Sequence, residues 1–211
     1  MELKEAYNRL LMDNSFSFLM TREGRFVAWE DYHAEVGLTK AQVELCIHVV
    51  PGSFNPLHDG HRAIYKAAHW APELTFFEVS IQRVDKDMVT FEELTKRLEQ
   101  FKGYAPVIVG RAGRFVEKIG TFLEHTKELF FHVGIDTITR MRDDYATVGI
   151  QGLNAKFVVH DRIVEGKLKS LKTEFGKNIP FNCVSSPVVR TPKNLAISST
   201  KIRENGDSGL N

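Results

Sequence analysis

The sequence predicts a doubly wound α/β fold with a mostly parallel central sheet. From Leu45 onward, short apolar runs rich in Val, Ile and Phe alternate with amphipathic helical patterns. The runs are almost continuously apolar, which is typical of strands buried on both faces of a parallel sheet. Repeated strand–helix–strand units join through right-handed crossovers and place helices on both faces of one sheet.

The expected elements alternate along the chain. Six strands are predicted, at Leu45–Val50, Leu74–Ile81, Pro106–Val109, Leu129–Val133, Lys156–His160 and Pro180–Val184. Four helices are predicted, at Arg62–Ala71, from Thr90 to about Gly103, at Phe115–Phe122 and at Asp136–Arg142. Thr90-Phe91-Glu92-Glu93 is a capping-box pattern, in which the Thr and Glu side chains each bond the other's backbone N–H. Gly103 stands where that helix is expected to stop.

Residues 1–44 are expected to form a small N-terminal appendage packed on the main domain, residues 45–211. Glu2–Met12 has the pattern of an amphipathic helix, and Phe16–Met20 with Phe26–Trp29 is expected to form a hairpin around Arg22–Gly24. The polar segment after Arg203 is expected to fray.

Composition and charge exclude several classes of protein. The 211 residues are 43% hydrophobic and 26% charged, as in ordinary globular domains and unlike disordered or fibrous chains. The formal net charge of +1 gives no global electrostatic case for binding nucleic acid or a membrane, so any anion site must be local. No apolar stretch approaches the roughly 20 residues needed to span a bilayer.

The cysteines and the N-terminus favour a reduced compartment. Cys46 and Cys183 each lie in an apolar run and are expected to be small buried thiols. Charge interrupts the first residues, so no signal peptide is expected and the cytoplasm is the predicted location. The sequence leaves the oligomeric state open, a homo-oligomer included.

The segment from Pro51 to His61 carries the clearest functional signal. It reads Pro-Gly-Ser-Phe-Asn-Pro-Leu-His-Asp-Gly-His and directly follows a predicted strand. Open α/β sheets bind ligands at the carboxyl ends of their strands, and Gly52 lets the backbone approach a ligand there. Gly60 and His61 begin a helix, whose free N–H groups and dipole favour an anion. His58 and His61 can both reach a phosphate at this point; the alternative is two turn histidines without function.

This segment resembles the Gly-Ser/Thr-Phe-Asp/Asn-Pro-x-His-x-Gly-His motif of the nicotinamide-nucleotide adenylyltransferase branch of the H-x-G-H nucleotidyltransferase superfamily. The resemblance implies a Rossmann-like nucleotidyltransferase fold. It implies that His58 and His61 hold triphosphate oxygens and stabilise charge on the transferring phosphoryl group. The loop residues expected to bind nucleotide beside them are Gly52, Ser53, Phe54, Asn55 and Gly60.

A second motif stands near the C-terminus, at Ile197–Arg203. Ser198, Ser199 and Thr200 are small hydroxyl residues, which cap helix starts and donate hydrogen bonds to phosphate. Arg203 lies one turn into the expected helix, with a planar fork suited to phosphate oxygens. On its own the string could be an ordinary capped helix with a surface arginine. It resembles the Ile-Ser-Ser-Thr-x-x-Arg motif of the same family, which implies nucleotide binding by the hydroxyls and a catalytic role for Arg203.

Two middle segments are also similar to a subgroup of these adenylyltransferase-like proteins. The resemblance implies that Lys86, after the second strand, is a mobile cation near the triphosphate; the alternative is a solvated loop lysine. It implies that Gly134, Asp136 and Thr137, after the fourth strand, line the nucleotide pocket. A helix N-cap role for Asp136 is compatible with that.

A third middle segment extends the resemblance past the fifth strand. Arg162 is expected close to the bound nucleotide, although His160 and Asp161 depart from the small residues often found before it. The similarity then spans Leu45 to Arg203 and leaves the N-terminal appendage uncovered. The cytidylyltransferase branch carries an Arg-Thr-x-Gly-Ile-Ser-Thr string, so the C-terminal motif favours adenylyl transfer.

The residue inventory fits transfer of a nucleotidyl group. A substrate phosphate is already anionic and can attack the α-phosphorus without a side-chain base, so catalysis rests on positioning and charge stabilisation. The expected partners are ATP and a phosphorylated small molecule, with nicotinamide mononucleotide as the first choice. Mg²⁺ is the expected cofactor, held mainly by substrate phosphates and water rather than by a protein carboxylate cage.

Other functions remain to be weighed. A serine or cysteine hydrolase lacks the G-x-S-x-G elbow, and a Walker-type NTPase lacks its glycine-lysine loop. A metal site at the H-x-G-H string lacks an evident third ligand. A nonenzymatic nucleotide-binding module is the alternative from a different class. Among enzymes, nicotinate mononucleotide, phosphopantetheine and an alcohol or sugar phosphate are alternative acceptors, and CTP is an alternative nucleotide.

Overall fold

A computed structural model describes residues 1–68, 71–82, 87–145, 149–164 and 166–186. Its centre is an eight-stranded sheet in the order β10-β7-β6-β3-β4-β5-β1-β2. The six strands from β10 to β5 run parallel, and β1 pairs antiparallel with both β5 and β2. The predicted doubly wound, mostly parallel α/β fold is therefore confirmed. The strand that precedes the Pro51–His61 motif, β3, is fourth in the order, at the centre of the sheet.

The strands occupy these residues: β1 Ser17–Met20, β2 Phe26–Val27, β3 Cys46–Pro51, β4 Thr75–Ser80, β5 Val107–Gly110, β6 Glu128–Gly134, β7 Lys156–His160, β8 Arg162–Val164, β9 Lys167–Lys169 and β10 Cys183–Ser185. The helices are α1 Leu3–Met12, α2 Trp29–Glu35, α3 Lys40–Leu45, α4 Asp59–Ala68, α5 Phe91–Glu99, α6 Phe115–Leu123, α7 Ile135–Asp144 and α8 Leu171–Phe175. Short 3₁₀ turns lie at Pro72–Leu74 and Ile150–Gly152. No helix in these described segments is both long and apolar enough to cross a bilayer.

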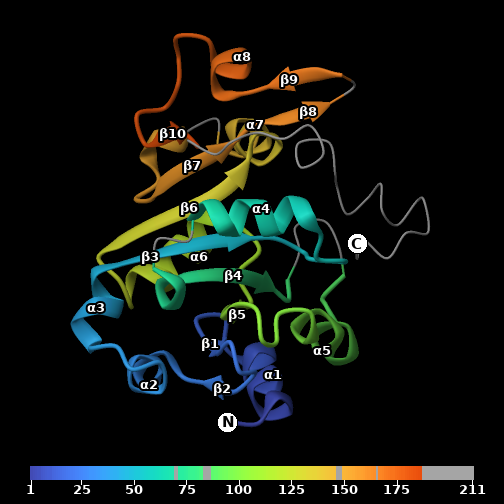
Figure 1. Ribbon diagram of the computed structural model, residues 1–211, viewed down its shortest axis with the longest axis vertical. Helices are drawn as coiled ribbons and strands as arrows, with labels where there is room; N and C mark the ends of the chain where they lie inside the picture. Colours follow the sequence, from blue (N-terminus) through green and yellow to red (C-terminus); the bar gives the residue numbers. More distant parts are fainter. Residues whose placement is uncertain (69–70, 83–86, 146–148, 165, 187–211) are drawn as a thin grey trace.

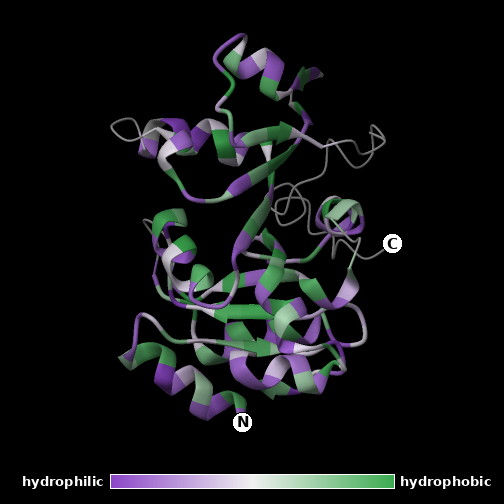
Figure 2. Cartoon of the chain, turned by 90° about the vertical axis from the view of Figure 1, so that its left-hand side faces the viewer, coloured by the Kyte–Doolittle hydropathy of each residue, from purple (hydrophilic) through white to green (hydrophobic). Residues whose placement is uncertain are grey.

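Helices cover both faces of the sheet, and each face has its own apolar core. Buried residues of α1, α4 and α5 pack on one face around Phe77, while those of α2, α3, α6 and α7 pack on the other around Phe76 and Phe131. Figure 2 shows the central strands mostly in the hydrophobic colour, while the helices on either side alternate between hydrophilic and hydrophobic residues. Adjacent side chains of a strand point to opposite faces, so Phe76 and Phe77 serve the two cores in turn.

The first 44 residues extend the sheet beyond β5. β1 pairs along β5 from Ser17 with Gly110 to Met20 with Val107. Helix α1 packs on the same face as α5, and the Tyr7 hydroxyl donates to the Val89 carbonyl at 3.0 Å. Figure 1 shows these N-terminal elements at one end of the molecule and the β8–β9 hairpin with α8 at the opposite end.

Two expectations need correction at the level of single elements. Trp29 does not belong to the second hairpin strand, which ends at Val27; it begins α2, and its indole N–H donates to the Ser17 hydroxyl at 2.7 Å. The strand expected at Pro180–Val184 is confined to Cys183–Ser185. Just before it, the Asn182 side-chain amide donates to the carbonyls of Ile150, Leu153 and Ala155, while the Asn182 backbone carbonyl accepts from the Phe157 N–H at 2.8 Å.

Other local predictions are confirmed. Thr90 caps α5 through the expected capping box with Glu93. Gly103 has a φ of +72°, which favours glycine, and its N–H donates to the Arg22 carbonyl at 2.7 Å. By contrast, the prediction that this helix stops at about Gly103 is wrong, because α5 ends at Glu99 and the chain turns before it reaches Gly103. Cys46 and Cys183 are both buried free thiols.

Candidate active site

The motif loop after β3 is fixed at both of its ends by hydrogen bonds. The Gly52 N–H donates to the carbonyl of Glu78 on β4 at 3.1 Å. Farther along, the Gln100 side chain accepts from the Leu57 N–H at 2.7 Å and donates to the Phe54 carbonyl at 3.0 Å. The loop is thus held at the carboxyl edge of the sheet, where ligands of this architecture bind.

Gly52 and Phe54 have a packing role that explains part of the motif. Phe54 is fully buried, and its ring meets those of Phe77, Phe101 and His61 edge-on. A Cβ on Gly52 would lie 2.7 Å from the Phe54 ring, so no side chain fits there. The intervening Ser53 and the following Asn55 are exposed on the loop.

His58 caps helix α4 with its ring. Its Nδ1 accepts from the backbone N–H of Gly60 at 3.1 Å and of His61 at 3.4 Å. These donors require a lone pair on Nδ1, so the neutral ring carries its proton on Nε2. A donor on Nε2 is backed by two helix N–H groups, and hydrogen bonds in such a chain polarise one another. The positive end of the helix dipole therefore strengthens the hydrogen bond that His58 can donate from Nε2.

His61 lies against His58 with the rings stacked. The centroids are 3.7 Å apart and the planes are inclined by 19°. The Nδ1 atom of His61 is buried and has no hydrogen-bond partner among the residues that the structure describes. An imidazole nitrogen in that condition is costly unless a ligand or water supplies a partner.

Both rings are held neutral in the free protein. Burial, together with the nearby charge of Arg162, lowers the pKa of His58 to about 4. Burial also lowers the pKa of His61 to about 3, helped by His58 and Arg162. Two stacked imidazolium ions would repel each other, so at most one ring is expected to gain a proton without a bound anion.

Arg162 and Asp136 meet beside this pair of histidines. A guanidinium nitrogen, Nη1, of Arg162 bonds the Asp136 carboxylate, and the side chains are 29% and 40% exposed. The Arg162 Nε is buried without a hydrogen-bond partner within the described ranges. Because Arg162 lowers the pKa of both histidines, its charge lies within electrostatic reach of them.

The structure thus brings together residues that the sequence only proposed. Gly134 ends β6, Asp136 and Thr137 lie half-buried in the first turn of α7, and Arg162 begins β8. Lys86, Ser198, Ser199, Thr200 and Arg203 lie outside the described residues. The expected roles of these residues in nucleotide binding and catalysis therefore stay predictions.

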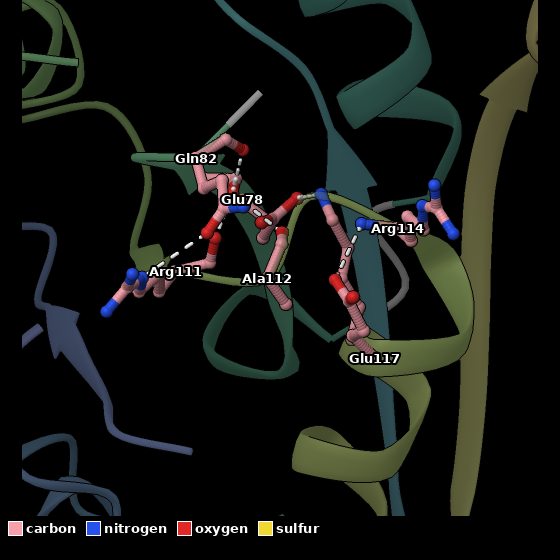
Figure 3. Close-up of polar contacts among 8 residues, drawn as sticks. Glu78, Gln82, Arg111, Ala112, Arg114 and Glu117 are labelled. Atoms are coloured by element: carbon pink, nitrogen blue, oxygen red, sulfur yellow. Dashed lines mark hydrogen bonds and ion pairs between the residues drawn. The ribbon is translucent and has the colours of Figure 1, made fainter. Parts of the chain in front are cut away.

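A buried ion pair fixes the side chain of Glu78, the residue whose backbone carbonyl bonds Gly52 of the motif loop. The Lys118 ammonium of α6 lies 2.6 Å from the Glu78 carboxylate of β4, and the side chains are only 8% and 1% exposed. Burial raises the pKa of Glu78, and Lys118 opposes that shift. Figure 3 shows Glu78 next to a loop in which Arg111 contacts Gln82, while the Arg114 side chain points away from that group.

Gln100 is a residue of the site that sequence reasoning missed. It follows the last residue of α5, and nothing in its local pattern distinguishes it from a solvated helix-end glutamine. Its role appears only once the motif loop is placed beside α5.

Replacing Gln100 with alanine should lower the free energy of unfolding by about 1–3 kcal/mol, because the Leu57 N–H and the Phe54 carbonyl lose their partner. Urea denaturation measures the change. Gln100→Glu, which retains the acceptor for Leu57 but not the donor for Phe54, should fall between the two. Equal stability of all three proteins would show that the loop does not depend on this side chain.

A family profile and two solved structures match this chain. A family profile described as Cytidylyltransferase-like matches residues 49–205, which is more than half of the chain. The chain is similar to the solved structure of Plasmodium falciparum nicotinic acid mononucleotide adenylyltransferase complexed with NaAD, with 16% identity, a TM-score of 0.48 and coverage of 76% of this chain and 83% of the other. The complex of the same protein with APC gives 15% identity and the same TM-score and coverage. A search among curated proteins found no match. On the family match, the chain belongs to the Cytidylyltransferase-like family and is a nucleotidyltransferase.

Proposed function

We propose that this chain transfers AMP from ATP to nicotinamide mononucleotide, giving NAD and pyrophosphate. The observation that supports a phosphate site is the stacked His58–His61 pair at the start of α4, beside Arg162. The choice of ATP and of the acceptor is supported by the resemblance of Gly134–Thr137 and Ile197–Arg203 to the adenylyl-transferring branch. The choice of substrates thus rests on sequence motifs alone, whereas the phosphate site also rests on the geometry of His58, His61 and Arg162.

The proposed reaction needs no protein nucleophile. An oxygen of the acceptor phosphate attacks the α-phosphorus of ATP, a new P–O bond forms, and the bond from the α-phosphorus to the bridging oxygen of pyrophosphate breaks. The attacking oxygen is already deprotonated, so no side-chain base is required. His58 donates from Nε2 to a phosphate oxygen, and the Arg162 guanidinium and the His61 ring stabilise negative charge beside it.

Mg²⁺ would neutralise phosphate charge and orient the triphosphate. The described residues contain no group of three or more His, Cys, Asp and Glu side chains that could hold a metal ion. We expect the ion to be held mainly by phosphate oxygens and water, as Mg²⁺ commonly is in such enzymes.

Nucleotide binding should be accompanied by proton uptake. The charge of Arg162 is offset by Asp136, so a polyphosphate meets two neutral histidines with pKa values of about 4 and 3. Its negative charge should raise these pKa values toward the usual value of about 6.5 for histidine or beyond. A pKa that is higher in the bound state makes binding tighter as pH falls through that bound-state value.

Titration calorimetry of ATP in buffers of different ionisation enthalpy measures this uptake. Between about pH 8 and about pH 6, the proton uptake per nucleotide should grow and the affinity should rise. His61→Asn should reduce the uptake. Release of protons on binding, or no exchange of protons in any buffer, would contradict the predicted proton uptake.

The proposed function is tested by pyrophosphate release and by a coupled NAD-formation assay with ATP, Mg²⁺ and nicotinamide mononucleotide. Formation of NAD at a rate that depends on His61 supports the proposal. Turnover of nicotinate mononucleotide, another phosphorylated acceptor or CTP, without NAD, would replace the substrate and leave the mechanism standing. Tight ATP binding without turnover of any acceptor would favour a nonenzymatic nucleotide-binding module.

A further inference from the structure

Three buried histidines form a hydrogen-bonded row across the central sheet. His48 Nδ1 lies 2.9 Å from His132 Nε2, and His132 Nδ1 lies 3.4 Å from His160 Nε2. The side chains come from β3, β6 and β7, and the residues are only 8%, 5% and 8% exposed. We call these three residues the histidine row.

The row runs diagonally toward the phosphate site. His48 is paired with Phe130, two residues before His132, and His160 is paired with Gly134, two residues after it. Each step along the row therefore moves two residues toward the carboxyl ends of the strands. All three side chains project from the face that α4 covers, because their neighbours Val49, Val133 and Val159 belong to the opposite core.

The row is built for hydrogen bonding rather than for metal binding. The ring nitrogens face one another in pairs, so each pair shares one proton and one lone pair. Two neutral arrangements satisfy both contacts: every ring protonated on Nε2, or every ring protonated on Nδ1. A charged His132 could donate both ways, but burial, together with His160 and His48, lowers its pKa to about 3. A fully satisfied buried network of this kind fixes the elements that contribute to it.

The same two chain segments are linked a second time at the active site. Asp136 lies four residues after His132, and Arg162 lies two residues after His160. The His132–His160 contact and the Asp136–Arg162 ion pair are thus successive links between the end of β6 and the end of β7. The backbone ladder pairs the two strands as far as Gly134 and His160, and the His132–His160 contact adds a side-chain link there, next to the ion pair.

We propose that His132 and His160 are positioning residues, whose hydrogen bond holds the ends of β6 and β7 so that Asp136 directs Arg162 to the phosphate site. The inference rests on the proposed function only in taking the anion there to be a nucleoside triphosphate. His48 completes the row from its far end and lies on β3, not on the strands that precede Asp136 and Arg162.

His132→Phe and His160→Phe keep a flat ring and remove the hydrogen bond. Both variants should bind ATP and inorganic tripolyphosphate about tenfold or more weakly, since a small misplacement of a charged group can cost that much or more. His48→Phe is the matched control, because it also breaks the row on the same face. It should lower the melting temperature like the others and leave both affinities unchanged. His160→Gln, whose amide can donate to His132 Nδ1, should restore part of the affinity.

A second readout needs no ligand. The Nε–H signal of Arg162, identified with Arg162→Ala in a ¹⁵N-correlated spectrum, should shift in His132→Phe and His160→Phe but not in His48→Phe. In the Arg162→Ala background, His160→Phe should weaken tripolyphosphate binding no further. That result separates an effect through Arg162 from general loosening of the sheet.

The outcomes are distinct. An unshifted Arg162 signal with wild-type affinities in folded His160→Phe would overturn the proposal, and so would an equal loss of affinity in His48→Phe. Should His132→Phe fail to fold, the comparison of His160→Phe with His160→Gln decides. If the wild-type protein binds neither ATP nor tripolyphosphate but the Arg162 signal shifts as expected, the proposed function is wrong and the positioning role stands.

Discussion

His61→Ala should reduce the rate of nucleotidyl transfer by about 10²–10³-fold, the usual loss when one transition-state donor is removed. The His61 ring stacks on His58 at 3.7 Å, and its Nδ1 is buried without a partner among the described residues. Among the described residues, no side chain other than that of His61 is stacked on the His58 ring, so its loss should not be compensated. Steady-state kinetics with saturating ATP and acceptor measure the change, and the loss is expected in kcat.

Two further variants separate this role from folding. His125 also stacks on an aromatic ring, that of Trp29 at 4.5 Å, but it follows α6 and belongs to the opposite face of the sheet. His125→Ala should therefore leave the rate unchanged. His58→Asn should keep the cap of α4, because Asn is a good N-cap residue, and still lose rate through loss of the imidazole donor. Wild-type turnover in His61→Ala would refute the assigned role.

Lys118→Met should lower the free energy of unfolding by about 3–5 kcal/mol, because it leaves a buried carboxylate without its counter-charge. Glu78 is only 1% exposed, and burial already raises its pKa. Without Lys118 this pKa should rise further. The unfolded chain then loses the Glu78 proton at lower pH than the folded one, so the variant should become less stable as pH rises from about 4.

Chemical denaturation at several pH values tests this expectation. The matched control is the double variant Glu78→Gln with Lys118→Met, which removes both charges and should recover much of the lost stability. A single variant as stable as the wild type, or no more sensitive to pH than the double variant, would show that the ion pair does not hold α6 on β4.

The central strands could be predicted because their apolarity is continuous. Lys156–His160 was predicted to the residue, and β3, β4 and β6 within one residue at either end. The β8–β9 hairpin was missed for a physical reason. Its arms, Arg162–Val164 and Lys167–Lys169, have three residues each, which is too short for a period to show.

The histidines of the site could be predicted from the motif, but the Asp136–Arg162 pair depends on the register of two strands. His58 and His61 stand three residues apart on one helix start, so their proximity follows from sequence. The meeting of Asp136 with Arg162 requires β6 and β7 to be neighbours with Gly134 opposite His160. The histidine row also depends on which strands are neighbours and in which register. In the sequence, each of its histidines is only a single polar residue within an apolar run or at its end.

The pairing of β1 with β5 determines the order in which the sheet can close. Ser17 leaves the ribosome early, but its partner Gly110 is made only when half of the chain has been translated. Until then Phe18, Leu19 and Met20, all fully buried in the finished fold, have only the two-residue strand β2 beside them. Contacts between distant parts of a chain are slow to form, and an unpaired apolar strand invites association with other chains. The N-terminal strand is thus expected to wait longest, after its own synthesis, for its partner in the centre of the sheet.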